Sequence, residues 1–218
     1  MRNLITDLIS YLIPIRINEV YSSINGKILV EKYCASLRLT VDWYWQSGRY
    51  AEELISKALK VIPNNKTKIK NILLLGLAGG SFIKVLRQSY PESTITAIDL
   101  DPVIVSLGQK YFGLDKIKNL KIQIFEASEF VKKAKKNHYD LIIMDIFIGC
   151  NTPSSVETES YLKNLFKILR KEGVLIVNRS NLPKYRNITD AFVKKVKKRF
   201  SKVNLVISNP NLLIIAYK

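Results

Sequence analysis

From residue 70 onward, short apolar runs alternate with amphipathic segments, and this alternation restricts the fold more than any other feature of the sequence. The first run, Ile72–Leu75, is apolar at every position, as expected of a strand that is buried on both faces. Strands that alternate with helices form right-handed βαβ units around a parallel sheet. Further strands are predicted at 94–98, 121–125, 140–144 and 173–177, with helices at 82–89, 102–112, 128–136 and 157–171.

The chain ends differently, in a basic helix followed by two strands at 203–207 and 212–217. Only Ser208–Asn211 separate these strands, so they must be antiparallel. The predicted fold is therefore α/β and Rossmann-like: a doubly wound, mostly parallel seven-stranded sheet that ends in an antiparallel hairpin.

The N-terminal part has another pattern, in which apolar and polar residues alternate over 26–33 and 37–43. This pattern predicts a small β-hairpin region. An amphipathic helix is expected over 50–61, and the loop at Pro63–Lys66 is the best candidate boundary. We therefore expect a β-rich region with its helix at 1–62 and an α/β domain at 63–218, which contains most of the candidate functional residues described below.

The chain carries 35 Lys and Arg against 18 Asp and Glu, a formal net charge of +17. A charge of this size is compatible with a nucleic-acid partner. Much of the excess falls in the last third, on the helix that contains Lys194, Lys197 and Lys198, where apolar residues recur at helical spacing. A solvated helix face is the favoured interpretation, and a nucleic-acid patch is the alternative.

The two cysteines, Cys34 and Cys150, and the single histidine, His138, are too few for a disulfide framework or a zinc site. We expect no metal and a reduced, cytoplasmic compartment. No apolar run is long enough for a membrane span, and Asp7 and Pro14 interrupt the apolar N-terminus, so neither a membrane association nor a signal peptide is expected.

Candidate functional residues come directly after four predicted strands. In a doubly wound sheet, ligands bind at the carboxyl ends of the strands. The first strand is followed by the loop Gly76–Ser81, whose glycines allow the backbone to approach a ligand, although a plain strand-to-helix turn would look the same. Asp99, Glu126 and Asp145 follow the next three strands.

Each of these carboxylates has a functional and a structural interpretation. Asp99 can accept both ribose hydroxyls of an adenosine-containing ligand or cap a loop, whereas Asp101 is expected to cap the following helix. Glu126 can accept from the adenine amine or favour a helix dipole. Asp145 can hold or deprotonate an amine or hydroxyl nucleophile, or cap a loop. Their order along one sheet edge favours a nucleoside site.

Residues 71–178 resemble the spermidine synthase-like (polyamine aminopropyltransferase) family of class I S-adenosylmethionine-dependent methyltransferase-fold proteins. A weaker resemblance to the family's N-terminal β-domain and gatekeeping segment extends upstream. The matching segments are Leu75–Ser81, Ala97–Pro102, Tyr111–Gly113, Tyr139–Asp145 and Leu169–Leu175, and upstream Gly26–Val30, Leu39–Asp42, Gln46–Ser47 and Tyr50–Glu52.

The resemblance implies a role for each matching position. The cofactor would be S-adenosylmethionine or its decarboxylated form. The loop residues would line its methionine-derived chain, Asp99 would hold the ribose, and Glu126 with Ala127 the adenine. Asp145 would accept a proton from the attacking amine, and Tyr50 would lie over the pocket as a second catalytic residue. The cofactor-binding residues implied are Gln46, Gly76, Ala78, Gly79, Asp99, Leu100, Glu126, Ala127 and Asp145.

Three positions depart from the aminopropyltransferase pattern. Ala78 and Ile148 stand where the family carries carboxylates, and Ala51 stands where it carries His or Gln. A diamine is a dication, and each lost charge-assisted contact costs about 1.5–3 kcal/mol. We therefore favour methyl transfer to an unidentified small-molecule acceptor, although the acidic residue that methyltransferases often place before the loop is Leu74 here.

Three alternatives remain open. The first is a polyamine aminopropyltransferase that uses decarboxylated S-adenosylmethionine. The second is a nicotinamide-dependent oxidoreductase, which the Gly-x-Ala-x-Gly form of the loop disfavours. The third is a non-enzymatic nucleic-acid-binding module that uses the basic helix. Because relatives are often dimers, a homodimer is a further expectation.

Overall fold

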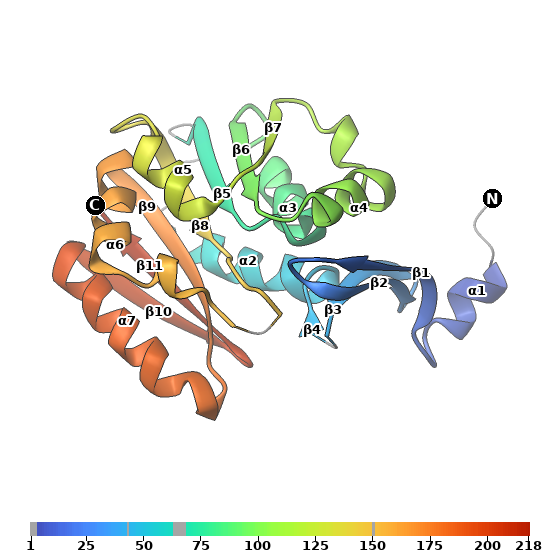
Figure 1. Ribbon diagram of the computed structural model, residues 1–218. Coiled ribbons are helices and arrows are strands. Elements are labelled where there is room, and N and C mark those ends of the chain that lie inside the picture. Colours follow the sequence, from blue (N-terminus) through green and yellow to red (C-terminus); the bar gives the residue numbers. More distant parts are fainter. Residues whose placement is uncertain (1–3, 43, 63–68, 150) are drawn as a thin grey trace.

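The computed structural model describes residues 4–42, 44–62, 69–149 and 151–218. Within these residues, the predicted α/β fold is confirmed as a seven-stranded sheet with a separate four-stranded sheet (Figure 1). The five strands from β9 to β7 are parallel, and β11 runs antiparallel to both of its neighbours. The order across the sheet is β10 (Lys202–Ser208), β11 (Asn211–Tyr217), β9 (Leu169–Ser180), β8 (Tyr139–Met144), β5 (Asn71–Leu75), β6 (Thr94–Asp99) and β7 (Leu120–Ile124).

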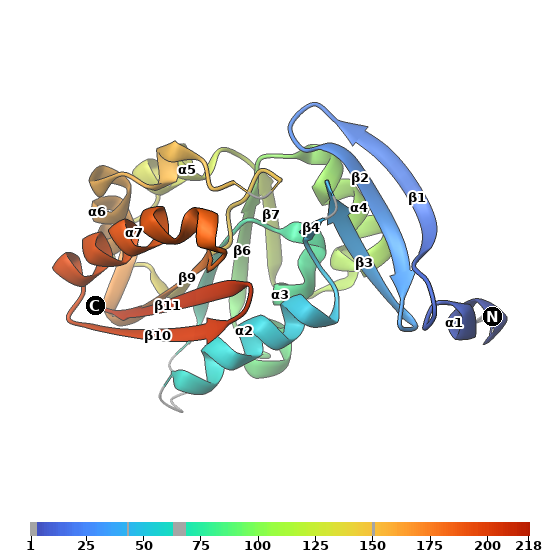
Figure 2. The same cartoon turned by 90° about the horizontal axis from the view of Figure 1, so that it is seen from below.

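Helices cover both faces of this sheet (Figures 1 and 2). One face carries α2 (Arg49–Val61), α3 (Ser81–Ser89) and α4 (Pro102–Phe112), and the other carries α5 (Ala127–Lys133), α6 (Glu159–Ile168) and α7 (Arg186–Arg199). Successive side chains of a strand point to opposite faces of the sheet and therefore pack in the two cores alternately. Because both faces are buried, the parallel strands are continuous apolar runs in the sequence.

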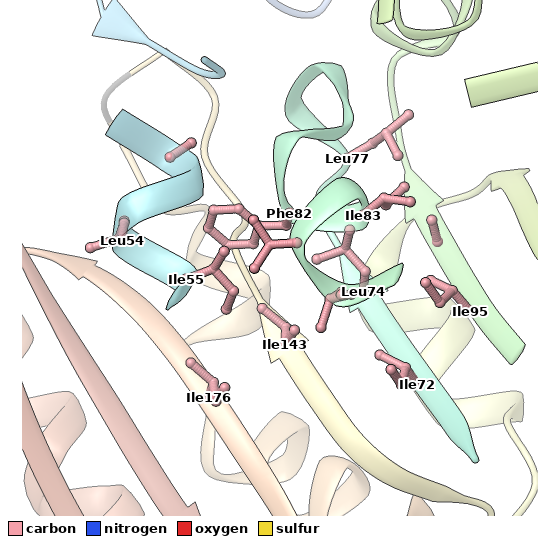
Figure 3. Packing of buried hydrophobic residues seen from close by; sticks show 14 of the residues in the cluster. Leu54, Ile55, Ile72, Leu74, Leu77, Phe82, Ile83, Ile95, Ile143 and Ile176 are labelled. Carbon is pink, nitrogen blue, oxygen red and sulfur yellow. The ribbon is translucent and has the colours of Figure 1, made fainter. Parts of the chain in front are cut away.

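Helix α2 is fixed to the sheet by buried apolar side chains (Figure 3). Ile55 is fully buried and Leu54 nearly so, and they pack with Phe82 of α3 over Ile143 and Ile176 of the sheet. Burial of such side chains stabilises each by about 1.5–3 kcal/mol. The first turn of α2, which carries Tyr50, is thereby held beside the sheet.

The four-stranded sheet consists of β1 (Ile15–Ser22), β2 (Gly26–Tyr33), β3 (Ser36–Val41) and β4 (Tyr44–Trp45) in that order. It lies beside α4, with α1 (Leu4–Ile9) projecting beyond it (Figures 1 and 2). The hairpin of β2 and β3 was predicted, whereas β1, β4 and α1 were not.

The turn between β1 and β2 is attached to the start of α4. Ser22 Oγ and Asn25 Nδ2 both donate to Asp101 Oδ2, at 2.5 and 2.7 Å. Asp101 is the N-cap of α4, as predicted, because its other oxygen accepts from the Val103 backbone N–H at 2.8 Å. One carboxylate thus caps a helix and docks the four-stranded sheet.

Two predicted helices are too long. The helix expected over 157–171 ends at Ile168, and 169–171 belong to β9, because Leu169 pairs with Tyr139 of β8. Leu169 is buried in β9, and its spacing from the buried Leu162 and Leu165 also fits the apolar face of α6, so apolar periodicity does not mark this boundary. The helix expected over 128–136 ends at Lys133.

Other predictions concern the termini, the loop and the cysteines. The predicted boundary at Pro63–Lys66 and Cys150 lie outside the described residues, and Cys34 is a free thiol. No helix in the described ranges is long and apolar enough to cross a membrane.

Helix α7 is amphipathic, as predicted from its sequence. Phe192 and Val196 are buried against the sheet, while Lys194, Lys197 and Lys198 are exposed. Exposed lysines are expected of a solvated helix face and of a nucleic-acid patch alike, so both interpretations of the basic cluster stay predictions.

Candidate functional site

The carboxyl ends of β5, β6 and β8 meet where the chain changes direction across the sheet. The strand after β5 in the chain, β6, lies on one side of it and β8 on the other, which makes the β5–β8 boundary a topological switch point. Gly76 has φ +92°, and a Cβ there would lie 2.0 Å from the Asp145 carbonyl oxygen. The first loop glycine is therefore required by the backbone that follows β8.

A first cavity of about 210 Å³ lies over these strand ends. Its walls contain seven of the residues predicted to bind the cofactor, together with apolar side chains from several elements. The predicted residues in its lining are Gln46, Gly76, Asp99, Leu100, Glu126, Ala127 and Asp145.

Gly79 is not in the described lining of this cavity, and the side chain of Ala78 lies outside what the structure describes. Both lie in the turn Ala78–Gly80, and a Cβ on Gly79 would lie 3.0 Å from Ser47 Oγ. The second loop glycine therefore allows the segment before α2 to pack against the loop. The predicted contacts of Ala78 and Gly79 with a cofactor remain predictions.

The Asp99 carboxylate is oriented by backbone donors. Its Oδ2 accepts from the Leu77 N–H at 2.8 Å, and its Oδ1 accepts from the Asp101 N–H at 2.9 Å. It lines the first cavity while it makes these bonds. The loop-capping and ligand-binding interpretations of Asp99 are thus geometrically compatible.

Glu126 combines two environments in the same way. It is the N-cap of α5, accepting from the Glu129 N–H at 2.8 Å and from Ser128 Oγ at 2.6 Å, and it also lines the first cavity. Burial raises its pKa, but these hydrogen bonds outweigh burial and lower the pKa below its ordinary value. Glu126 is therefore charged at neutral pH.

Asp145 has a different balance. Burial raises its pKa to about 6; a hydrogen bond from Asn178 Nδ2 at 2.8 Å opposes this rise, and the charge of Asp99 adds to it. A carboxylate with a pKa near the working pH can accept a proton and still be mostly ionised.

A second cavity of about 110 Å³ adjoins the first. Gln46, Asp145 and Phe147 line both cavities, and Asp145 is the one carboxylate among these shared residues. Asp145 is the only carboxylate in the described lining of the second cavity. The aromatic side chains that line the second cavity are Tyr44, Trp45, Tyr50, Phe82 and Phe147.

The two predicted residues from the N-terminal part, Gln46 and Tyr50, border this junction. Gln46 Nε2 donates to the Gly149 carbonyl oxygen at 3.1 Å, which ties the segment before α2 to the loop after β8. Burial, together with the charge of Asp145, raises the pKa of Tyr50 to about 12. The catalytic role predicted for Tyr50 remains a prediction, with the side chain in the second cavity.

Several lining residues were missed from the sequence. Ile24 and Asn25 of the β1–β2 turn and Val41 of β3 reach the first cavity through long-range packing, which leaves no local signal. Asn178, which lines the second cavity, did have a local signal in the sequence: it directly follows the predicted strand 173–177, as Asp145 follows the strand 140–144. Among the described residues, no three His, Cys, Asp or Glu side chains gather as a metal site.

Sequence comparison matches residues 49–215 to the family model for the spermine/spermidine synthase domain. The chain is 28% identical over 151 residues to a polyamine aminopropyltransferase of Vibrio vulnificus, covering 68% of this chain and 50% of that protein. It is 28% identical over 119 residues to the human eEF1A lysine and N-terminal methyltransferase, covering 49% of this chain and 17% of that protein. The chain thus spans half or less of the length of these two relatives.

Solved structures give the same fold. The structure of a probable spermidine synthase from Corynebacterium glutamicum aligns with a TM-score of 0.79 and 17% identity, over 94% of this chain and 80% of that chain. Human methyltransferase-like protein 13 in complex with SAH aligns with a TM-score of 0.66 and 20% identity, over 78% of this chain and 82% of that chain.

Proposed function

Because the chain belongs to the spermine/spermidine synthase family, we propose that it transfers the methyl group of S-adenosylmethionine to an amine. The observation that carries the proposal is the meeting of two cavities at Asp145. One offers carboxylates to a nucleoside, and the other offers aromatic walls and a single carboxylate to an acceptor.

The first cavity fits an adenosine group on its own chemistry. Asp99 presents a carboxylate that backbone donors hold in place, as binding of ribose hydroxyls requires. Glu126 presents a second acceptor beside apolar walls that suit a base, among them Ile98, Ile104 and Phe125. Gly76, Gln46 and Asp145 then border the end of the cavity where the reacting group of the bound molecule would lie.

The acceptor amine would enter from the second cavity and meet Asp145 at the junction. S-adenosylmethionine supplies a methyl carbon that is already activated by a sulfonium, so the protein needs little acid catalysis. Asp145 accepts the proton that the amine loses, and its raised pKa suits this transfer. The nitrogen–methyl bond would form as the methyl–sulfur bond breaks, and S-adenosylhomocysteine would leave as a neutral thioether. The remaining work of the protein is to hold the nitrogen in line with the carbon–sulfur bond.

Aminopropyl transfer is the second candidate, supported by the aminopropyltransferase among the relatives. It would use the same attack at the methylene carbon next to the sulfonium, with Asp145 again accepting the proton. Against it stand the sequence positions Ala78 and Ile148, which lack the carboxylates that the resemblance leads us to expect for a diamine and a decarboxylated cofactor. The methyltransferase relative supports methyl transfer.

Calorimetry with the two cofactors tests the choice. We expect S-adenosylmethionine to bind at least tenfold more tightly than the decarboxylated form, with methylated amine as the product by mass spectrometry. A preference for the decarboxylated form, with methylthioadenosine released, would replace methyl transfer by aminopropyl transfer.

The same experiment can address the non-enzymatic alternative. If neither cofactor binds while nucleic acid binds with a steep salt dependence that survives Asp145→Ala, the chain is a binding module. The exposed lysines of α7 would then be the candidate contact surface.

A further inference from the structure

A chain of side-chain hydrogen bonds connects Asp145 to Tyr50 across two strands. Tyr50 Oη donates to Asn211 Oδ1 at 2.5 Å, Asn211 Nδ2 donates to Asn178 Oδ1 at 2.8 Å, and Asn178 Nδ2 donates to Asp145 Oδ1 at 2.8 Å. These four residues all line the second cavity. Asn178 lies in β9. Asn211 is the first residue of the neighbouring strand β11, and its register partner on β9 is Ser180.

The direction of this chain is fixed by its ends. An ionised carboxylate can only accept, so Asn178 must turn its NH₂ group toward Asp145 and its carbonyl oxygen toward Asn211. Asn211 must in turn present its NH₂ group to Asn178 and its carbonyl oxygen to Tyr50. The Tyr50 hydroxyl then has to donate, which agrees with a raised pKa that keeps it protonated.

We propose that Asn178 and Asn211 are positioning residues that present Asp145 and Tyr50 to one amine nitrogen at the junction of the two cavities. Asn178 occupies Oδ1 of Asp145, which leaves Oδ2 to receive the proton of the acceptor. The Tyr50 hydroxyl donates to Asn211, with the Ser208 carbonyl oxygen as a second and longer contact at 3.3 Å, so the Tyr50 oxygen offers lone pairs and acts as a hydrogen-bond acceptor. The inference rests on the proposed function for the identity of the acceptor.

This arrangement specifies the acceptor class. Two hydrogen-bond acceptors converge on a nitrogen that must carry protons, and the rest of the described lining of the second cavity is mainly aromatic or aliphatic. A primary amine on an apolar stem satisfies such a site with one positive charge. A second ammonium group would find no further carboxylate in the described lining of this cavity.

The groups around Asp145 define what its titration will report. Asp99 and Glu126 line the first cavity from the ends of β6 and β7, and Tyr44 and Tyr50 face the second cavity from β4 and α2. No Lys, Arg or His appears in the described lining of either cavity. The Asn178 donor is therefore the main contact that stabilises the Asp145 anion.

A ¹³C NMR titration of the Asp145 carboxyl tests the proposal without turnover, with Asp145→Asn used to assign the signal. We expect Asn178→Ala to raise the Asp145 pKa by about one unit, because the donor to a charged group is lost. Asn211→Ala should raise it less, because it acts through Asn178. The double variant should then shift no further than Asn178→Ala, as a coupled chain requires.

The matched control is Asn181→Ala. It removes a neighbouring side-chain amide that donates to Asn209 and takes no part in the hydrogen bonds between Tyr50 and Asp145. It should leave the Asp145 pKa unchanged. If Asn178→Ala does not fold, Asn178→Leu keeps the volume and gives the same readout. The proposal is overturned if the Asp145 pKa is unchanged in the Asn178 variant. It is also overturned if the pKa shifts of the two single variants add in the double variant.

Kinetics separate this inference from the proposed function. In the Asn178 variant, the acid limb of kcat/KM against pH should move upward with the NMR pKa, and Asn181→Ala should keep the wild-type profile. If the NMR shifts occur but no primary amine is a substrate, the positioning of Asp145 stands and the proposed amine chemistry fails.

Discussion

The two cavities that meet at Asp145 are built in different ways. In the first, Asp99 and Glu126 receive backbone N–H groups from residues two or three positions further along the chain, at Asp101 and Glu129. In the second, Asp145 accepts a hydrogen bond from the side chain of Asn178. Tyr50 is linked to Asn178 through Asn211, which lies 161 positions after Tyr50 in the sequence. The comparison teaches that strand ends and helix starts place the carboxylates of the first cavity, whereas the polar groups of the second cavity are brought together by tertiary assembly.

The largest effect should come from the group that the cavities share. Asp145→Asn should lower kcat by about 10²–10⁴-fold, because the amide cannot accept the amine's proton. Binding of S-adenosylhomocysteine, measured by calorimetry, should change little. The control is Asp190→Asn on the exposed side of α7, which should keep full activity. Full activity in Asp145→Asn would remove Asp145 from the chemistry.

The next largest effect should come from the backbone under the first cavity. Gly76→Ala should lower the free energy of unfolding by about 3 kcal/mol, since a Cβ would clash with the Asp145 carbonyl oxygen at a positive φ. Gly113→Ala is the matched control: its φ is +69°, and no atom lies within 4 Å of the added Cβ. It should cost only about 1 kcal/mol. Equal losses in urea unfolding would argue against the clash.

The raised pKa of Asp145 also predicts a stability effect. Its folded pKa of about 6 exceeds the ordinary value of 3.8, so its contribution is fully present below 3.8 and is lost as the pH rises through 6. Asp145→Asn should therefore unfold with about 1–3 kcal/mol more free energy at pH 8. At pH 5 the gain should be roughly half as large. A variant that is less stable than wild type at pH 8 would contradict the burial of this charge.

The smallest effect should concern the nucleoside. Asp99→Asn should weaken S-adenosylhomocysteine binding by at least about tenfold, because a charge-assisted contact becomes a neutral one. The NMR pKa of Asp145 should fall slightly in the same protein, since a neighbouring negative charge is lost. Unchanged affinity would limit Asp99 to its two backbone hydrogen bonds.

The sheet could be predicted from the sequence, and so could the placement of three carboxylates at one of its edges, for a physical reason. A parallel strand buried on both faces is a continuous apolar run, and the residue that follows it is placed at the sheet edge. Asp99, Glu126 and Asp145 could therefore be assigned to one edge without any knowledge of distant contacts. Asp101 was assigned as a cap by the same local rule.

The second cavity could be predicted only in part. Asn211 lies in the turn region between two predicted strands, and nothing local indicates that it meets Tyr50 across the sheet edge. The β1–β2 turn was likewise not predictable as part of the site. Asn25 lines the first cavity because its side chain donates to Asp101, a residue distant in the sequence. The end of α6 was misplaced because Leu169, which is buried in β9, also continues the apolar spacing of α6.

The attachment of Ser22 and Asn25 to Asp101 has a thermodynamic consequence. The turn that makes these bonds also forms a wall of the first cavity, so release of the four-stranded sheet would open that cavity. A molecule that binds only the closed form must then favour closure by mass action. Binding of the proposed nucleoside in the first cavity should therefore slow amide hydrogen exchange in β2, which is distant in the sequence from the strand ends β6 and β8 at that cavity.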